Sequence, residues 1–247
     1  MTAPLFLVSP GSLAGLQPGS EVTVQGAEAH HAVAVMRVRI GEQVFVCDGA
    51  GTRALADVTG VDRHTVHALC RVVETQPPPD PRVVLVQALA KGDRDEQAIE
   101  AATELGVDVV VPWQAERSVV QWRDERAERG RRKWESIVLA ASKQARRFRV
   151  PEVRPLARRQ DVAELLAGAR LAIVLHENAG MPLAGLALPQ TGDVVVVVGP
   201  EGGISPEELT AFDAAGGRQV RLGREVLRAS SAGPAGLAVL NAAGRWR

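Results

Sequence analysis

Two patterns of hydrophobic and polar positions divide the chain near residue 74. Up to residue 73, β-branched residues in partial alternation with polar ones form short segments, separated by turn signals about every ten residues. This spacing predicts a small β-barrel or sandwich. The stretch "AEAHHAVAVMRVRIG" interrupts the alternation and predicts one short helix that ends before Gly41.

From residue 83 onward, apolar segments alternate with amphipathic ones. "RVVLVQALA", "VDVVVPW", "RLAIVLHE" and "DVVVVVG" are apolar on both faces, as buried parallel strands are. Helical patterns occupy residues 95–105, roughly 124–147, 205–215 and 231–245, and "RQVRLG" predicts a further short strand. The fold class predicted is therefore α/β, with a mostly parallel sheet covered on both faces.

A proline-rich stretch separates the two patterns. "ETQPPPDPR", residues 74–82, has four prolines in nine residues, so no helix can cross it. We therefore expect a first domain over residues 1–73, a linker over 74–82 and a second domain over 83–247.

Composition narrows the classes of function. No apolar run approaches the ~20 residues that span a bilayer, and the N-terminus lacks the features of a secretory signal, so we expect a cytoplasmic protein with no membrane partner. Cys47 and Cys70 lie outside any metal-binding spacing, and no third ligand lies near His64 and His67. We expect no metal site.

The formal net charge of zero conceals one basic segment. Residues 117–159 contain 14 Lys or Arg and 5 Asp or Glu, a net charge of +9. Such a segment is either a solvated helix face or a surface that binds a polyanion such as RNA.

The stretch "VVVVVGPEGGISPEEL", residues 194–209, predicts a buried strand, a glycine loop and a helix. We expect Gly199, Gly202 and Gly203 to allow unusual φ values or close approach of a ligand. Ser205 and Glu208 have the spacing of a capping box at the start of the helix. The loop is either a ligand site at a strand end or only a helix cap.

The loop matches neither common phosphate-binding motif, and Glu201 would repel a phosphate. A cofactor with adenosine, no phosphate and a positive centre would tolerate this carboxylate, and S-adenosylmethionine fits that description. Two further strand ends, "IVLHENAG" and "VRLGREVLRASSAG", either converge with the loop into one pocket or are ordinary strand termini.

Several motifs together resemble the RsmE-type 16S ribosomal RNA (uracil-N3) methyltransferases of the SPOUT class. T-E-L-G-V at 103–107, E-R-S at 116–118 and G-P-E-G-G at 199–203 form a specific combination in this order. The resemblance covers nearly the whole chain and also rests on "HHAVAVMRVRIGEQVFVCDGAG", "KGDRDEQ", "KQARRFRVP", "HE" and "LGREVLR".

The resemblance implies a PUA-like β-barrel followed by a SPOUT domain with a deep C-terminal trefoil knot. It further implies a homodimer that transfers a methyl group from S-adenosylmethionine to N3 of one uridine in 16S ribosomal RNA of the small ribosomal subunit.

The resemblance also assigns roles to residues. Arg228 and Glu201 are the candidate catalytic residues. Arg228 either stabilises negative charge on the uracil ring or forms an ion pair in the core or at a dimer interface, and Glu201 either orients a loop or contacts the substrate. The cofactor is expected to contact Leu175, His176, Glu177, Gly199, Pro200, Gly202, Leu222, Gly223 and Leu227. RNA is expected to contact His31, Arg37, Lys91, Arg94, Arg117, Arg131, Arg132, Gln144 and Arg147.

The chain departs from the family pattern at three places. The basic start before the first strand is absent, Lys143 replaces an acidic residue, and Ser230 stands where glutamate is common. Ser230 and the altered N-terminus favour one alternative, a ribosome-assembly factor that binds RNA without catalysis. A second alternative is a SPOUT ribose 2′-O-methyltransferase, against which the T-E-L-G-V and E-R-S motifs and the N-terminal barrel argue.

Overall fold

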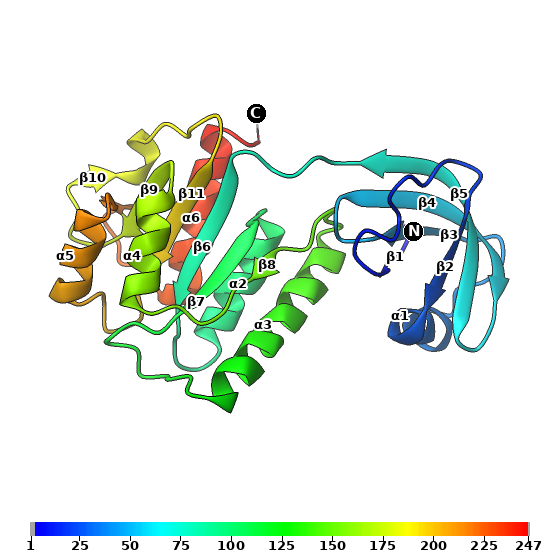
Figure 1. Ribbon diagram of the computed structural model, residues 1–247, viewed down its shortest axis with the longest axis horizontal. Helices are drawn as coiled ribbons and strands as arrows, with labels where there is room; N and C mark the ends of the chain where they lie inside the picture. Colours follow the sequence, from blue (N-terminus) through cyan, green and yellow to red (C-terminus); the bar gives the residue numbers. More distant parts are fainter. Residues whose placement is uncertain (1–2, 247) are drawn as a thin grey trace. The chain divides into compact units, whose positions relative to one another are not determined.

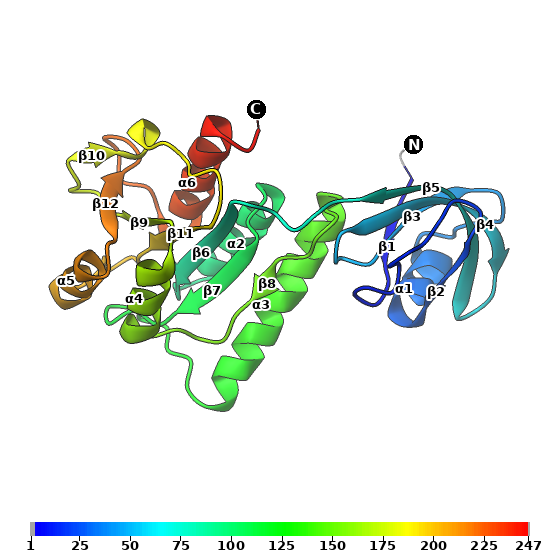
Figure 2. The same ribbon diagram turned by 45° about the horizontal axis from the view of Figure 1, so that its top comes forward.

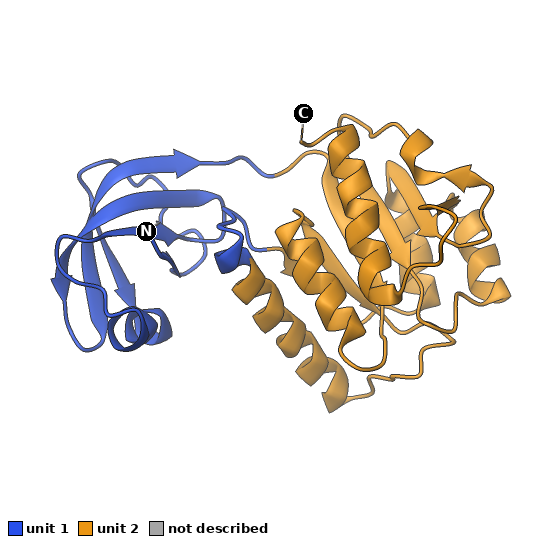
Figure 3. Cartoon of the chain, turned by 180° about the vertical axis from the view of Figure 1, so that it is seen from behind, with its two compact units in different colours: residues 1–78, 142–150 blue, residues 79–141, 151–247 orange. Residues whose placement is uncertain are grey.

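The computed structural model describes residues 3–246, and these form two compact units (Figure 3). The first unit contains the residues up to Pro78 together with Ser142–Val150, and the second contains Pro79–Ala141 and Pro151–Arg247.

The first unit is built on one five-stranded sheet in the order β1-β3-β4-β5-β2. The β1–β3 pair is parallel and the other pairs are antiparallel. Buried alternate residues of these strands pack with a short helix into one core that includes Phe6, Val24 and Val46. The strands are β1 (Leu5–Leu7), β2 (Glu21–Gln25), β3 (Gln43–Cys47), β4 (Thr52–Val61) and β5 (Thr65–Thr75).

The helix of the first unit is shorter than the sequence predicts. An α-helical turn, α1 (Gly26–His30), continues as a π-helical turn, η1 (His31–Val35), and is capped at Met36. Arg37 then adopts a left-handed φ of 55° and turns the chain out of the helix, four residues before Gly41, where the sequence places the latest end of the helix.

Residues 142–150 join the first unit, although the linear domain boundaries place them in the second. The Lys143 ammonium lies 2.7 Å from Oε1 of Glu28, and the Val150 N–H donates to the carbonyl of Gly49. This ion pair gives Lys143 a structural partner at a position where the family pattern has an acid.

The second unit contains a seven-stranded sheet in which every strand pair is parallel (Figures 1 and 2). Its order is β10-β12-β9-β11-β6-β7-β8, so the valine-rich strand β11 lies at the centre and is paired on both sides. The strands are β6 (Arg82–Ala88), β7 (Val109–Trp113), β8 (Glu152–Val153), β9 (Leu171–Leu175), β10 (Met181–Pro182), β11 (Asp193–Val198) and β12 (Arg218–Arg221).

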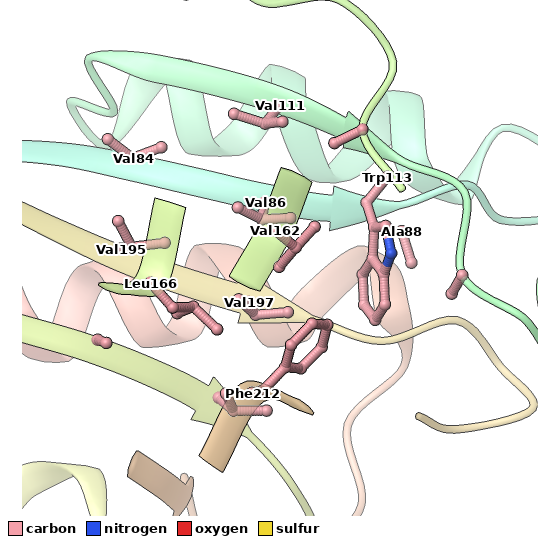
Figure 4. Close-up of a cluster of buried hydrophobic side chains, with 14 of the residues drawn as sticks. Val84, Val86, Ala88, Val111, Trp113, Val162, Leu166, Val195, Val197 and Phe212 are labelled. Atoms are coloured by element: carbon pink, nitrogen blue, oxygen red, sulfur yellow. The ribbon is translucent and has the colours of Figure 1, made fainter. Parts of the chain in front are cut away.

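Helices cover both faces of this sheet, as the apolar strands predict. α2 (Arg94–Glu104) and α6 (Ala229–Ala243) pack together on one face, and α4 (Arg159–Gly168) and α5 (Pro206–Ala214) on the other. Figure 4 shows the core beneath α4 and α5, where Trp113 meets Phe212 edge-on at 5.4 Å between ring centroids. The basic helix α3 (Glu125–Gln144) and the 3₁₀ turn η2 (Leu183–Gly185) complete the unit, apart from the last residues of α3.

The sequence pattern predicts neither α4 nor the two-residue strands β8 and β10. Among residues 3–246, no helix is both long enough and apolar enough to cross a membrane.

Candidate active site

The three strand ends "LHE", "VGPEGGI" and "LGREVLR" meet at one edge of the parallel sheet and line a cavity of about 320 Å³. We call it the strand-end pocket. The carboxyl ends of β9, β11 and β12 supply its walls. Open α/β sheets bind their ligands at this edge. It is lined by the predicted residues Leu175, His176, Glu177, Gly199, Pro200, Glu201, Leu222, Gly223, Leu227 and Arg228, and also by Arg94.

The glycines of the 199–203 loop differ in what requires the absence of a side chain. A Cβ at Gly199 would lie 2.7 Å from Cγ1 of Ile204, and one at Gly202 would lie 3.1 Å from Cβ of Arg117. Only Gly203 has a left-handed φ, of 73°. The close approach at Gly199 and Gly202 is therefore to side chains of the chain itself, and Gly202 is absent from the described lining of the pocket.

A buried carboxylate fixes the end of this loop. Glu208 is fully buried, and its two oxygens accept the N–H groups of Ser205 at 3.0 Å and Glu116 at 2.8 Å. The Ser205 hydroxyl accepts the N–H of Glu208, which confirms the predicted capping box. The same hydroxyl donates to Glu116 at 2.6 Å, so the start of α5 and the E-R-S segment form one network.

The rest of the E-R-S segment binds the neighbouring loops. The Arg117 guanidinium donates to the carbonyl of Gly202 at 3.2 Å, and the Ser118 hydroxyl donates to the carbonyl of Leu89 at 3.0 Å. Arg117 therefore holds the glycine loop from outside the pocket, a position that the sequence analysis assigned to RNA contact.

Glu201 ties the glycine loop to the loop after β6. Its Oε1 accepts the Lys91 N–H at 3.1 Å and an Arg94 guanidinium N–H at 2.9 Å. Partial burial acts to raise the pKa of Glu201, but hydrogen bonds from its own N–H, from Lys91 and from Arg94 outweigh burial and lower the pKa. The geometry therefore favours a loop-positioning anion, since a general base at neutral pH needs a raised carboxyl pKa.

Arg228 lies at the N-cap of α6, is exposed and lines the pocket. Within residues 3–246, its guanidinium has no hydrogen-bond or ion-pair partner, so no intrachain ion pair neutralises it. Ser230 is the second residue of α6, two residues after Arg228, and does not belong to the described lining.

The end of β9 contributes both polar and acidic groups. The His176 N–H donates to the carbonyl of Val220, which fixes β9 against β12, and Nδ1 of His176 accepts the Asn178 N–H at 3.3 Å. Glu177 and Glu225 place carboxylates on the pocket wall. The sequence analysis missed Glu225 and Val226 as lining residues, although both lie inside the quoted motif "LGREVLR".

The predicted RNA-binding residues fall into three groups. Lys91, Arg94 and Arg117 surround the pocket loops of the second unit, as described above. In the first unit, His31 packs edge-on against Phe6, Arg37 and Gln144 are exposed, and Arg147 donates to the carbonyl of Arg149.

Arg131 and Arg132 form the third group, on α3. Arg131 pairs with Glu128 and Glu135, and Arg132 pairs with Glu128 at 3.3 Å. These two arginines satisfy their charge within their own helix. The arrangement favours the solvated-face interpretation for this pair over the predicted RNA contact.

Comparison with known proteins agrees with this fold and pocket. A family model for an RNA methyltransferase domain matches residues 77–241, and one for an RNA methyltransferase PUA domain matches residues 24–69. Over 234 residues the chain is 41% identical to a ribosomal RNA small subunit methyltransferase E of Mycobacterium bovis, covering 92% of this chain and 89% of the relative. A relative with the same description from Bacillus subtilis is 29% identical over 85% of each chain.

A solved structure of a ribosomal RNA small subunit methyltransferase E from Neisseria gonorrhoeae, bound to S-adenosylmethionine, has a TM-score of 0.83 to this chain. The identity is 27%, and the match covers 98% of both chains. Fold, PUA domain and strand-end pocket thus define an RNA methyltransferase of the SPOUT class. The chain belongs to the ribosomal RNA small subunit methyltransferase E family.

Gly199→Val should weaken cofactor binding about fivefold or more, because the new side chain must displace Ile204 from the pocket wall and such overpacking costs about 1–3 kcal/mol. Titration calorimetry with S-adenosylmethionine measures the effect. Gly180→Val is the matched control, since a Cβ at Gly180 meets no atom within 4 Å. Equal affinities of the two variants would contradict the role of Gly199.

Proposed function

We propose that this protein transfers a methyl group from S-adenosylmethionine to N3 of one uridine in 16S ribosomal RNA, within the small ribosomal subunit in the cytoplasm. The observation that carries the proposal is the convergence of three motif-bearing strand ends on one pocket, with the unpaired cation Arg228 on its wall.

The lining of the pocket suits this cofactor. Leu175, Leu222 and Leu227 offer apolar surface for the adenine and ribose, and Glu177 and Glu225 offer carboxylates for a ligand with positive charge. The pocket volume of about 320 Å³ lies at the lower end of the range for small-molecule sites. When bound, S-adenosylmethionine supplies a methyl group that is already activated for transfer.

The protein then has two tasks, to align the uridine and to stabilise the charge that develops on its ring. Uracil N3 carries a proton at neutral pH. Attack of N3 on the methyl group therefore requires loss of this proton, which leaves negative charge on the ring. Arg228 is suited to stabilise this charge, because its guanidinium is always protonated and has no acidic partner in the chain. We assign Glu201 a positioning role, in which it holds Arg94 and the glycine loop in place.

We further propose that the protein is a homodimer in which the second subunit covers the pocket rim. The side chain of Val226 is 75% exposed and that of Leu227 is 40% exposed in the single chain, directly on the pocket wall. Apolar residues at the mouth of a site favour burial by another protein surface.

Light scattering at micromolar concentration should therefore give about twice the chain mass of 26.2 kDa. Val226→Asp should shift the distribution toward monomer, because the carboxylate would be buried at the interface. A wild-type mass near 26 kDa would contradict the dimer.

Purified small subunits from cells that lack this protein should become labelled when incubated with it and methyl-labelled S-adenosylmethionine. Digestion to nucleosides and mass spectrometry should place the label in 3-methyluridine. Label in a 2′-O-methyl nucleoside would instead support the ribose methyltransferase, and no label at all would support a non-catalytic assembly factor.

Arg228→Ala should lower kcat about a hundredfold and leave cofactor affinity nearly unchanged, because the guanidinium is proposed to act on charge that develops in the transition state. Arg224→Ala is the matched control, since Arg224 lies exposed in the same loop and outside the described pocket lining. Equal turnover of the two variants would remove Arg228 from the mechanism without affecting the assigned reaction.

A further inference from the structure

A second cavity, separate from the strand-end pocket, lies between residues 120–122 and helix α3 in the second unit. Its volume is about 590 Å³, and we call it the Trp122 hollow. Four basic side chains line it, those of Arg126, Arg129, Arg132 and Lys133, and the described lining contains no acidic residue. The hollow therefore combines an aromatic ring with a concentration of positive charge.

The Trp122 ring is held in a fixed position. Its edge-on partner is the buried Trp134, at 5.4 Å between ring centroids and an interplanar angle of 73°. The ring also lies directly on the backbone of α3, since a Cβ at Gly130 would come within 2.5 Å of it. The backbone N–H of Trp122 donates to Oε1 of Gln114 at 2.9 Å, and this hydrogen bond anchors the loop that precedes α3. A half-buried ring that needs no rearrangement loses little conformational entropy on binding a ligand.

The four cations of the hollow are not equivalent. Arg132 pairs with Glu128, and Lys133 pairs with Glu96 at 2.5 Å. The guanidinium groups of Arg126 and Arg129 form no ion pair or hydrogen bond with any residue that the structure describes. Two uncompensated positive charges thus lie beside the Trp122 ring.

We propose that the Trp122 hollow binds an unpaired nucleotide of the RNA substrate, with its base against Trp122 and its phosphates at Arg126 and Arg129. The proposal rests on the proposed function, in which RNA is the substrate. Unpaired RNA is recognised by stacking of bases on aromatic rings and by cations along the backbone, and the hollow offers both. An acidic peptide would use the two arginines but would gain nothing from the ring.

Fluorescence anisotropy with the full-length protein and a labelled single-stranded oligoribonucleotide of about ten nucleotides tests the proposal. Trp122→Ala should weaken binding about tenfold, because stacking on an aromatic ring contributes about 1–3 kcal/mol per base. Trp122→Phe should restore most of the affinity and also shows that the α3 region still folds.

The double variant Arg126→Ala, Arg129→Ala should lower the salt dependence of binding, with the slope of log K against log salt falling by about 1.4 for two lost phosphate contacts to a single strand. Arg131→Ala is the control on the same helix, because Arg131 is paired with Glu128 and Glu135 and lies outside the hollow. We expect little change in its slope.

The proposal is overturned if Trp122→Ala binds the oligoribonucleotide as tightly as the wild type does. It is also overturned if the double variant has the same salt slope as Arg131→Ala. Equally tight binding of poly-glutamate and RNA would also overturn it, since charge alone would then explain binding. Methylation of small subunits separates this outcome from failure of the proposed function. If the wild-type protein methylates small subunits and the variants of the Trp122 hollow keep the wild-type KM, only the proposal for the Trp122 hollow is overturned. Variants with raised KM and unchanged kcat would support it.

Discussion

The strand-end pocket depends on one buried carboxylate, that of Glu208. A buried carboxylate without partners would destabilise the fold, so its two oxygens must each find donors. Ser205 and Glu116 supply them through their backbone N–H groups. Because one donor comes from the start of α5 and the other from the loop after β7, Glu208 joins two segments that lie 92 residues apart in sequence. The glycine loop is held between them.

This network explains why the E-R-S and G-P-E-G-G motifs occur together. Glu116 accepts the Ser205 hydroxyl, and Arg117 donates to the Gly202 carbonyl, so the outer surface of the glycine loop is bound by the E-R-S segment. Glu201 binds the other side to Lys91 and Arg94. The loop is therefore positioned before any ligand binds. The main role of the Glu201 carboxylate is to hold the conformation of the loop and not to take part in the reaction.

Local sequence patterns predicted the central strands and helix α5 of the second unit, because unalternated valine strands and the Ser205–Glu208 capping box are local signals, but not α4, β8 or β10. They could not predict that Lys143 pairs with Glu28, since an ion pair across 115 residues leaves no trace in periodicity. The same limit explains why residues 142–150 were placed in the wrong unit. It also applies to the trefoil knot, which is a property of the chain path and came only from the resemblance.

The candidate site shows the complementary limit. The sequence indicated which strand ends could converge, but it could not distinguish a glycine that admits a ligand from one that admits Ile204 or Arg117. Charge was similarly ambiguous. The net charge of +9 over residues 117–159 counts Arg131 and Arg126 alike. Arg131 is paired within α3, whereas the guanidinium of Arg126 has no partner among the described residues. Since a paired arginine must release its carboxylate before it binds a phosphate, an unpaired arginine such as Arg126 binds RNA at a lower free-energy cost than a paired one such as Arg131.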